Sequence, residues 1–269
     1  TSAMSPSFGS GVPLGQNVRT IPAPDANFTA HIQAAIADLQ RHGIQPAALI
    51  VDTIFSSDGV YADPPGFLRT AVKAIRAAGG LFIADEVQPG FARTGSHFWG
   101  FQRHDVIPDM VSLGKPMGNG YPVAGLVMKP EIIAKFGAKS RYFNTFGGNA
   151  VAAATAMAVL DVIEGEHLQA NSQTVGAYFR DGLLALAKTY ESLGPLRSAG
   201  LFLGQDIVTN GQPDGLKAAH ITNALRDRRI LISATGPFGH TLKIRPPLVF
   251  ATSNADIFLE GLEKVLKTL

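Results

Sequence analysis

The sequence predicts an α/β fold: a large domain built on a mainly parallel sheet, followed by a small α+β domain. Helical and strand-like patterns alternate in the first half of the chain, which is typical of strands joined by right-handed crossovers. Several strand-like runs end at charged residues, as strands do at the ligand-binding edge of an open sheet. The composition changes near Gly165, so we expect the large domain at residues 1–164 and the small domain at residues 165–269.

Each element of the large domain is expected from a local pattern. Residues 1–27 are rich in Pro, Gly, Ser and Asn and predict a loop. The expected helices carry apolar residues at steps of three and four, at residues 28–41, 66–78, 131–136 and 149–164. The expected strands are short apolar runs bounded by turn residues, at 47–51, 81–84, 110–113 and 121–128.

The small domain contains helical and strand-like patterns that do not alternate regularly. Helical spacing predicts helices up to about Tyr190, at residues 216–228 and from Asn254 to the C-terminus. Strand-like patterns cover residues 196–208 and the surroundings of Ile230 and Leu242. Such a mixture favours an α+β unit over a continuation of the parallel sheet.

Composition and charge exclude several classes of partner. The formal net charge is +2 with both signs scattered, so the chain lacks the basic stripe that nucleic acid requires. It has no run of about 18 apolar residues, so we expect no membrane span. No export signal is recognisable, and a cytoplasmic location is the default expectation.

Metal and thiol chemistry are not expected either. Cysteine is absent, which removes disulfides and thiolate ligands. The histidines at 31, 42, 97 and 104 form no metal-ligand spacing with one another or with carboxylates, so we interpret them as surface or loop residues. The single tryptophan, Trp99, lies between Phe98 and Phe101 and is expected to pack in the core or an interface.

Two charged residues at expected strand ends suggest a cofactor. Asp85 follows one apolar run, and Lys115 follows another after a glycine; Asp52 also lies at a strand end. Pyridoxal phosphate needs a lysine for its Schiff base and an acid that keeps its pyridine nitrogen protonated. Lys115 would then require a partly desolvated pocket that lowers its pKa. Alternatively, each residue alone is structural or solvated, or the strand ends belong to a nucleotide-binding α/β module.

Three motifs in order resemble the class III, or subgroup II ω-type, aminotransferases, which are pyridoxal phosphate enzymes of fold type I. They are IADEVQPGFARTG, SLGKPMGNGYPVAG and FNTFGGNAVAAA. The resemblance implies that Asp85 pairs with the pyridinium nitrogen, Gln88 contacts the phenolic oxygen and Val87 packs on the ring. It also implies that Lys115 forms the Schiff base and shuttles the proton.

The same resemblance implies a homodimer with shared active sites. Thr145 would bind the cofactor phosphate of the neighbouring subunit. The alternative is that Thr145 caps the helix that follows Gly147 and Gly148.

The substrate position departs from the family pattern. Many members pair a Glu in the loop after the first strand with an Arg near a Pro-Pro; here these positions are Ser57 and Lys243. Lys243 and Arg245 are expected to share one strand face, where two cations would suit a carboxylate or a phosphate.

The surrounding motifs look closest to the branch of alanine–glyoxylate aminotransferases and ethanolamine-phosphate phospho-lyases. The expected function is therefore amino transfer from an amine or amino acid to a keto acid through a Lys115 Schiff base, with phospho-lyase activity on a phosphorylated amino alcohol as the alternative. Family members carry a phosphate-binding Gly-Ser turn and a ring-stacking aromatic before the part seen here. We therefore expect a C-terminal fragment of a subunit, which leaves a catalytically incomplete fragment as a further alternative.

Overall fold

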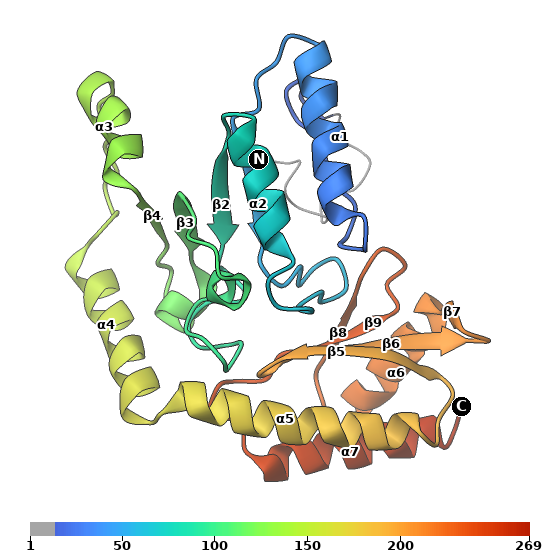
Figure 1. The fold of residues 1–269 in the computed structure, drawn as a ribbon. Coiled ribbons are helices and arrows are strands. Elements are labelled where there is room, and N and C mark those ends of the chain that lie inside the picture. The colour runs from blue at the N-terminus through green and yellow to red at the C-terminus, as the bar shows by residue number, and fades with distance from the viewer. Residues whose placement is uncertain (1–13) are drawn as a thin grey trace.

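The computed structural model describes residues 14–269, and residues 1–13 of the predicted N-terminal loop lie outside the described part. Residues 14–27 contain no helix or strand, as predicted. The described chain contains two separate sheets, each with helices packed against it (Figure 1). The predicted α/β fold with a mainly parallel first sheet is confirmed, whereas the domain boundary after residue 164 stays a prediction.

The first sheet has the strand order β1-β2-β3-β4. Its strands are β1 (Ala48–Asp52), β2 (Leu81–Asp85), β3 (Met110–Leu113) and β4 (Gly125–Met128). The first three strands run parallel to one another, but β4 is antiparallel to β3. The reason is the connection: a 3-10 turn, η4 (Lys115–Gly118), replaces a crossover helix, and a short link can only reverse the chain.

The helix α2 (Leu68–Ala77) packs on one face of this sheet, and α1 (Phe28–Arg41) packs beside α2 and adds to the same core. Alternate residues of β1 and β2 point into the core beneath them, with Leu49, Val51, Phe82 and Ala84 buried there. The residues between these therefore point to the opposite face. This alternation directs the last residue of each strand, Asp52 and Asp85, away from the helices.

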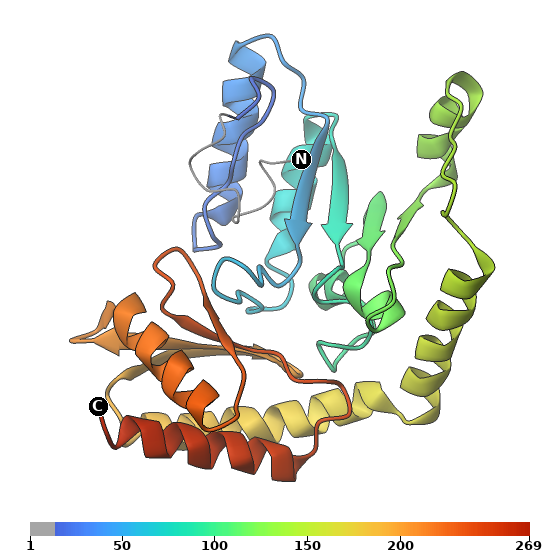
Figure 2. The same ribbon diagram turned by 180° about the vertical axis from the view of Figure 1, so that it is seen from behind.

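Beyond β4 the chain continues into α3 (Pro130–Lys139) and α4 (Ala150–Gly165), near the predicted positions. Both helices lie at the outer side of the molecule in both views (Figures 1 and 2). Large apolar side chains are exposed over this region, including Leu126, Val127, Phe136, Tyr142, Phe143, Phe146, Val151 and Met157. Such a large uncovered apolar area is typical of an interaction surface.

The second sheet is antiparallel, in the order β5-β6-β9-β8, with β7 (Gln212–Pro213) added to β6. Its other strands are β5 (Leu193–Ala199), β6 (Phe202–Thr209), β8 (Ser233–Thr235) and β9 (Thr241–Ile244). The single strand-like stretch expected at 196–208 is wrong, because the chain reverses at Gly200. Gly200 has a φ of +53° and touches the backbone at Thr94, which leaves no room for a side chain.

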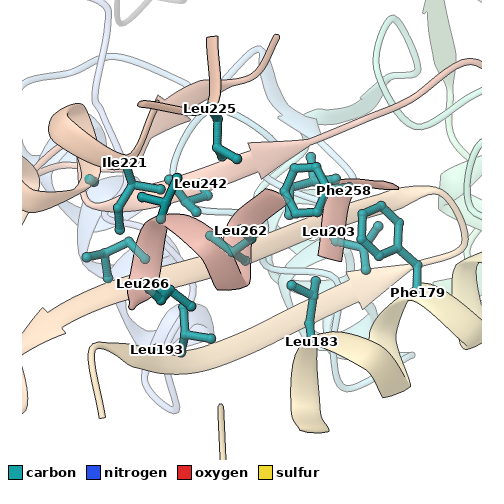
Figure 3. Packing of buried hydrophobic residues seen from close by; sticks show 14 of the residues in the cluster. Phe179, Leu183, Leu193, Leu203, Ile221, Leu225, Leu242, Phe258, Leu262 and Leu266 are labelled. Carbon is teal, nitrogen blue, oxygen red and sulfur yellow. The ribbon is translucent and has the colours of Figure 1, made fainter. Parts of the chain in front are cut away.

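Three helices complete this half of the molecule: α5 (Leu168–Ala187), α6 (Gly215–Asp227) and α7 (Thr252–Leu266). Their apolar faces and the sheet share one core, in which Phe179, Leu203, Leu242 and Phe258 are buried (Figure 3). Among the described residues, no helix is both long and apolar enough to cross a bilayer.

The two sheets meet at the loop that follows β1. Arg197 on β5 donates hydrogen bonds from Nε to the carbonyls of Gly59 and Val60, at 2.9 and 3.1 Å. The same guanidinium pairs with Asp206 through two hydrogen bonds, at 2.8 and 2.5 Å. Both side chains are largely buried. Arg197 therefore fixes the loop after β1 to the second sheet.

Replacing Arg197 with methionine is expected to lower the free energy of unfolding by about 3 kcal/mol, because the buried Asp206 keeps its hydrogen bond from Thr241 but loses the guanidinium that balances its charge. Urea denaturation measures the change. Arg180→Met is the control, because Arg180 pairs with Asp181 in solvent, and exposed pairs contribute about 1 kcal/mol at most. Equal effects of the two substitutions would contradict a fixing role for Arg197.

Candidate cofactor site

Three polar residues form a row across the carboxyl ends of the parallel strands. Asp52 is the register partner of Asp85, and Asp85 is the register partner of Ser112. Side chains at paired positions project from the same face, here the face opposite the α1 and α2 core. Lys115 begins the turn η4 just after β3. The strand order thus brings Asp85 and the Lys115 turn to one edge of the sheet, as predicted.

Val87 lies between Asp85 and the Lys115 turn. Its backbone N–H donates to Oδ1 of Asp85 at 3.1 Å. Its methyl groups lie 3.6 and 3.8 Å from the point where a Cβ on Gly114 would stand. Asp85, Val87 and Gly114 therefore form one continuous contact that ends at Lys115.

The backbone of Lys115 is held in an uncommon conformation. Its φ is +26°, in a region that non-glycine residues rarely adopt. Such strain persists only where the surroundings fix it, and it is concentrated at functional sites. The turn itself is closed by hydrogen bonds from the N–H groups of Met117 and Asn119 to the carbonyls of Gly114 and Pro116, at 2.9 and 3.2 Å.

Asp52 is fixed by the loop that follows it. Its carboxylate accepts hydrogen bonds from the N–H groups of Ile54 and Ser56, at 3.1 and 3.0 Å, and from the Ser56 hydroxyl. Burial raises the pKa of Asp52 to about 6 despite these bonds. The sequence indicated only that Asp52 ends a strand; its hydrogen bonds turn its carboxylate toward residues 53–56.

Lys243 enters the site from the second sheet. It is buried, and its Nζ lies 5.6 Å from the centre of the Phe202 ring. Burial, together with the positive charges of Arg245 and Lys115, lowers the pKa of Lys243 to about 8, although the negative charges of Asp52 and Asp58 oppose the shift. The effect of Lys115 places the two lysines within electrostatic range of each other.

The expected shared face of Lys243 and Arg245 is only partly realised. The strand β9 ends at Ile244, so strand alternation does not apply to the exposed Arg245. Both residues nevertheless border one cavity of about 660 Å³, whose other walls are mainly apolar and come from α5, α7 and the residues before β8.

Anion binding at Lys243 is expected to weaken as the pH rises. The lysine is protonated below its pKa of about 8 and neutral above it, so affinity for sulfate should fall about tenfold between about pH 7 and pH 9. Calorimetric titration with sulfate, whose charge is constant in this range, measures the change. Lys243→Arg should bind equally at both values because Arg stays charged. A flat profile for the unsubstituted chain would contradict the prediction.

Ser57 touches the second sheet through its backbone. Its carbonyl accepts hydrogen bonds from Oγ1 of Thr235 at 2.7 Å and from the N–H of Gly236 at 3.4 Å. The next residue, Asp58, supplies a negative charge near Lys243. Burial raises the pKa of Asp58, and the positive charge of Lys243 opposes this shift. The sequence pattern pointed to Ser57 as the changed position and did not indicate Asp58.

Thr145 and Gln88 are not joined to these residues by hydrogen bonds within residues 14–269. Gln88 is partly buried just after Val87, whereas Thr145 is exposed between α3 and α4. The alternative that Thr145 caps the following helix is wrong: Asn149 is the cap of α4, and its side chain accepts from the N–H of Ala152 at 3.0 Å.

Glu86 was not recognised from the sequence. It is buried and accepts hydrogen bonds from Oγ1 of Thr53 and from the N–H groups of Gly100 and Phe101, at 2.9, 2.6 and 2.9 Å. Burial raises its pKa to about 7. Glu86 ties the loop that carries Val87 to the 3-10 helix η3 (Gly100–His104).

The interpretation of His104 as a surface or loop residue is wrong. Its side chain is fully buried, with Nε2 at 2.9 Å from the Thr53 carbonyl and Nδ1 accepting from the Gly66 N–H at 3.2 Å. Burial lowers the pKa of His104 to about 4, so the ring is neutral near pH 7. Trp99 packs edge-on against Phe91 and Phe98, which agrees with the expected packing role.

The local chemistry fits pyridoxal phosphate. An acid, an apolar side chain and a lysine lie at the ligand-binding edge of a parallel sheet. Pyridoxal phosphate needs the lysine for its Schiff base and the acid for its ring nitrogen. One further group at this edge is unpaired: the Oγ of Ser112 is buried and makes no hydrogen bond within the described residues. The described residues also contain no cluster of His, Asp and Glu that could hold a metal ion.

Comparison with known proteins places this chain in a family. Residues 4–266 match the sequence profile of the class-III aminotransferases, and the chain belongs to that family. Membership makes pyridoxal phosphate the cofactor and fold type I the architecture. The predicted family is therefore confirmed.

The relatives include proteins named as aminotransferases and proteins named as phospho-lyases, the two activities of the predicted branch. The chain is 42% identical to the mitochondrial alanine–glyoxylate aminotransferase 2 homolog 2 of Arabidopsis thaliana, over 85% of this chain and 48% of the relative. It is 36% identical to ethanolamine-phosphate phospho-lyase homolog 1 of Caenorhabditis elegans, over 91% of this chain and 54% of the relative. Among solved structures, an Arthrobacter phospholyase in complex with phosphoethanolamine superposes with a TM-score of 0.93 at 39% identity, covering 96% of this chain and 65% of that one. The chain thus spans about half the length of the curated relatives it matches.

Proposed function

We propose that this chain carries the part of an aminotransferase site that binds the cofactor covalently. The protein would move an amino group from an amine or amino acid to a keto acid. The observation that carries the proposal is the contact from Asp85 through Val87 to the Lys115 turn at the carboxyl edge of the sheet. When bound, pyridoxal phosphate supplies an electron sink for the carbon that bears the amino group.

Each residue of the site has a proposed task. Lys115 would hold the cofactor through its Nζ and carry the proton between the reacting carbons. Asp85 would face the ring nitrogen and keep it protonated, because an adjacent carboxylate favours the charged form. Val87 would lie against the ring, and Gln88 would donate a hydrogen bond to the phenolic oxygen. The contacts around Asp85 and Val87 support the first three tasks; the task of Gln88 rests on the family resemblance.

A further part of the site is proposed to come from a neighbouring subunit. Thr145 is exposed, and aromatic side chains on either side of it, Tyr142, Phe143 and Phe146, are exposed as well. Uncovered aromatic residues around a polar one are typical of an interface. We therefore propose a homodimer in which Thr145 contacts the cofactor phosphate of the neighbouring subunit. A cytoplasmic location is likewise a proposal.

A phospho-lyase acting on a phosphorylated amino alcohol is the second candidate. The specific observation in its favour is the buried Lys243 with Arg245 nearby, where other members of the family pair a Glu with an Arg. Two cations suit a phosphate dianion better than they suit a single carboxylate. The similarity to a phospholyase in complex with phosphoethanolamine supports this candidate also.

Two assays separate these candidates. The first adds pyridoxal phosphate and measures its visible absorption band, which is expected to change on covalent attachment. The second compares pyruvate-dependent amino transfer with phosphate release from phosphoethanolamine, using Lys115→Ala as the blank. Amino transfer without phosphate release supports the aminotransferase. Phosphate release in the absence of a keto acid would establish the phospho-lyase instead, and no change of the absorption band would overturn both.

A further inference from the structure

The hydroxyl of Ser112 is a buried polar group without a hydrogen-bond partner among residues 14–269. Leaving such a group unpaired costs about 1–3 kcal/mol, so proteins rarely retain one without a reason. Ser112 lies on β3, three residues before Lys115, in the row that also contains Asp52 and Asp85. The unpaired group therefore belongs to the strand that positions the cofactor lysine.

The register places Ser112 directly beside Asp85. The two residues are Cα partners on neighbouring parallel strands, so their side chains project from the same face, where paired Cβ atoms are about 5 Å apart. A rotation about one side-chain bond can bring a serine hydroxyl at that position to a neighbouring carboxylate.

The carboxylate of Asp85 has a free acceptor for such a bond. Its Oδ1 accepts from the Val87 N–H, and within the described residues its Oδ2 accepts no hydrogen bond. On the other side of the row, the carboxylate of Asp52 is an acceptor without a proton to donate, and it accepts from Ile54 and Ser56. Of the two neighbours of Asp85 in the row, Ser112 is thus the one that can donate.

We propose that Ser112 is a positioning residue: when the cofactor is bound, the Ser112 hydroxyl, unpaired without it, turns to donate to Oδ2 of Asp85 and fixes that carboxylate against the cofactor ring nitrogen. The Val87 N–H and the Ser112 hydroxyl then hold the two oxygens of Asp85 from opposite sides. A carboxylate held at both oxygens keeps one orientation, and hydrogen bonds to an ionised acceptor are roughly twice as strong as neutral ones. This inference rests on the proposed assignment of Asp85 to the cofactor.

The test compares two isosteric replacements, Ser112→Thr and Ser112→Val, because they share a shape and differ only in the hydroxyl. The dissociation constant of pyridoxal phosphate, measured by fluorescence titration, should stay within about twofold for the threonine variant and rise about tenfold for the valine variant. A second measurement is the melting temperature without cofactor. There the valine variant should melt at or above the threonine variant, since its buried site contains no unpaired hydroxyl.

The affinities and melting temperatures together decide whether Ser112 has a positioning role. Weaker binding in the valine variant alone, with undiminished stability of its cofactor-free form, supports the positioning role. Equal affinities in all three chains would overturn it while the proposed function stands. A valine variant that is less stable than the threonine variant before any cofactor is added would show a structural role instead. If even the unsubstituted chain binds no pyridoxal phosphate, the proposed function fails for this chain and the inference falls with it. Should both variants misfold, Ser112→Ala is compared with the unsubstituted chain in the same two measurements.

Discussion

Replacing Lys115 with alanine is expected to abolish covalent attachment of pyridoxal phosphate and to lower the rate of amino transfer by about 10³-fold or more. Lys115 begins the turn at the end of β3, and its φ of +26° holds it at the edge of the sheet beside Asp85 and Val87. The measurements are the visible absorption band of the cofactor and the turnover number with a keto acid acceptor.

The controls for Lys115 separate charge from chemistry. Lys115→Arg keeps a cation but cannot form the same bond, so it should lose the band as the alanine variant does. Lys73→Ala removes an exposed lysine on α2 and should leave both measurements unchanged. A Lys115→Ala chain that kept the band and its turnover would contradict the assignment of Lys115.

Replacing Asp85 with asparagine is expected to lower the turnover number by about 10²–10³-fold while the cofactor stays attached to Lys115. Asparagine has nearly the same shape and can still accept from the Val87 N–H, but it carries no negative charge for the ring nitrogen. Rapid mixing with an amino donor, followed at the cofactor band, measures the slowed step. The two substitutions therefore differ in signature, since only the lysine variant loses the band.

Asp181→Asn is the matched control for Asp85. Asp181 lies on α5, is exposed and within residues 14–269 pairs with Arg180 alone, so its loss of charge should leave turnover unchanged. Unaltered turnover in Asp85→Asn would contradict the role given to Asp85. Loss of the cofactor band in that variant would show that Asp85 serves attachment more than chemistry.

The elements predicted best from the sequence are those set by local pattern. Phe28–Arg41 is a helix at its predicted bounds, because its apolar spacing and the glycine after it act within a few residues. The strands ending at Asp85 and Leu113 follow from apolar runs bounded by turn residues. Since parallel strands end at one edge, the meeting of Asp85 with the Lys115 turn could be predicted as well.

What the sequence could not reveal depends on contacts between distant segments. His104 looked like a loop histidine, but the carbonyl of Thr53 and the N–H of Gly66 enclose it. The hairpin at Gly200 was read as one strand because the β period continues on both sides of a single turn. Ser112 carries no local signal either, since its interest lies in the register that puts it beside Asp85. The roles of Asp85, Val87, Gln88, Lys115 and Thr145 toward the cofactor all stay predictions.

The central claim is that Lys115 is the residue that anchors the cofactor, and chemical labelling tests it most directly. The chain is incubated with pyridoxal phosphate, reduced with borohydride to make the attachment permanent, digested, and its labelled peptides are identified by mass spectrometry. The structure predicts one dominant label on Lys115, in the peptide that contains β3 and the turn η4 after it. A label distributed over exposed lysines, or concentrated on Lys243, would contradict the account.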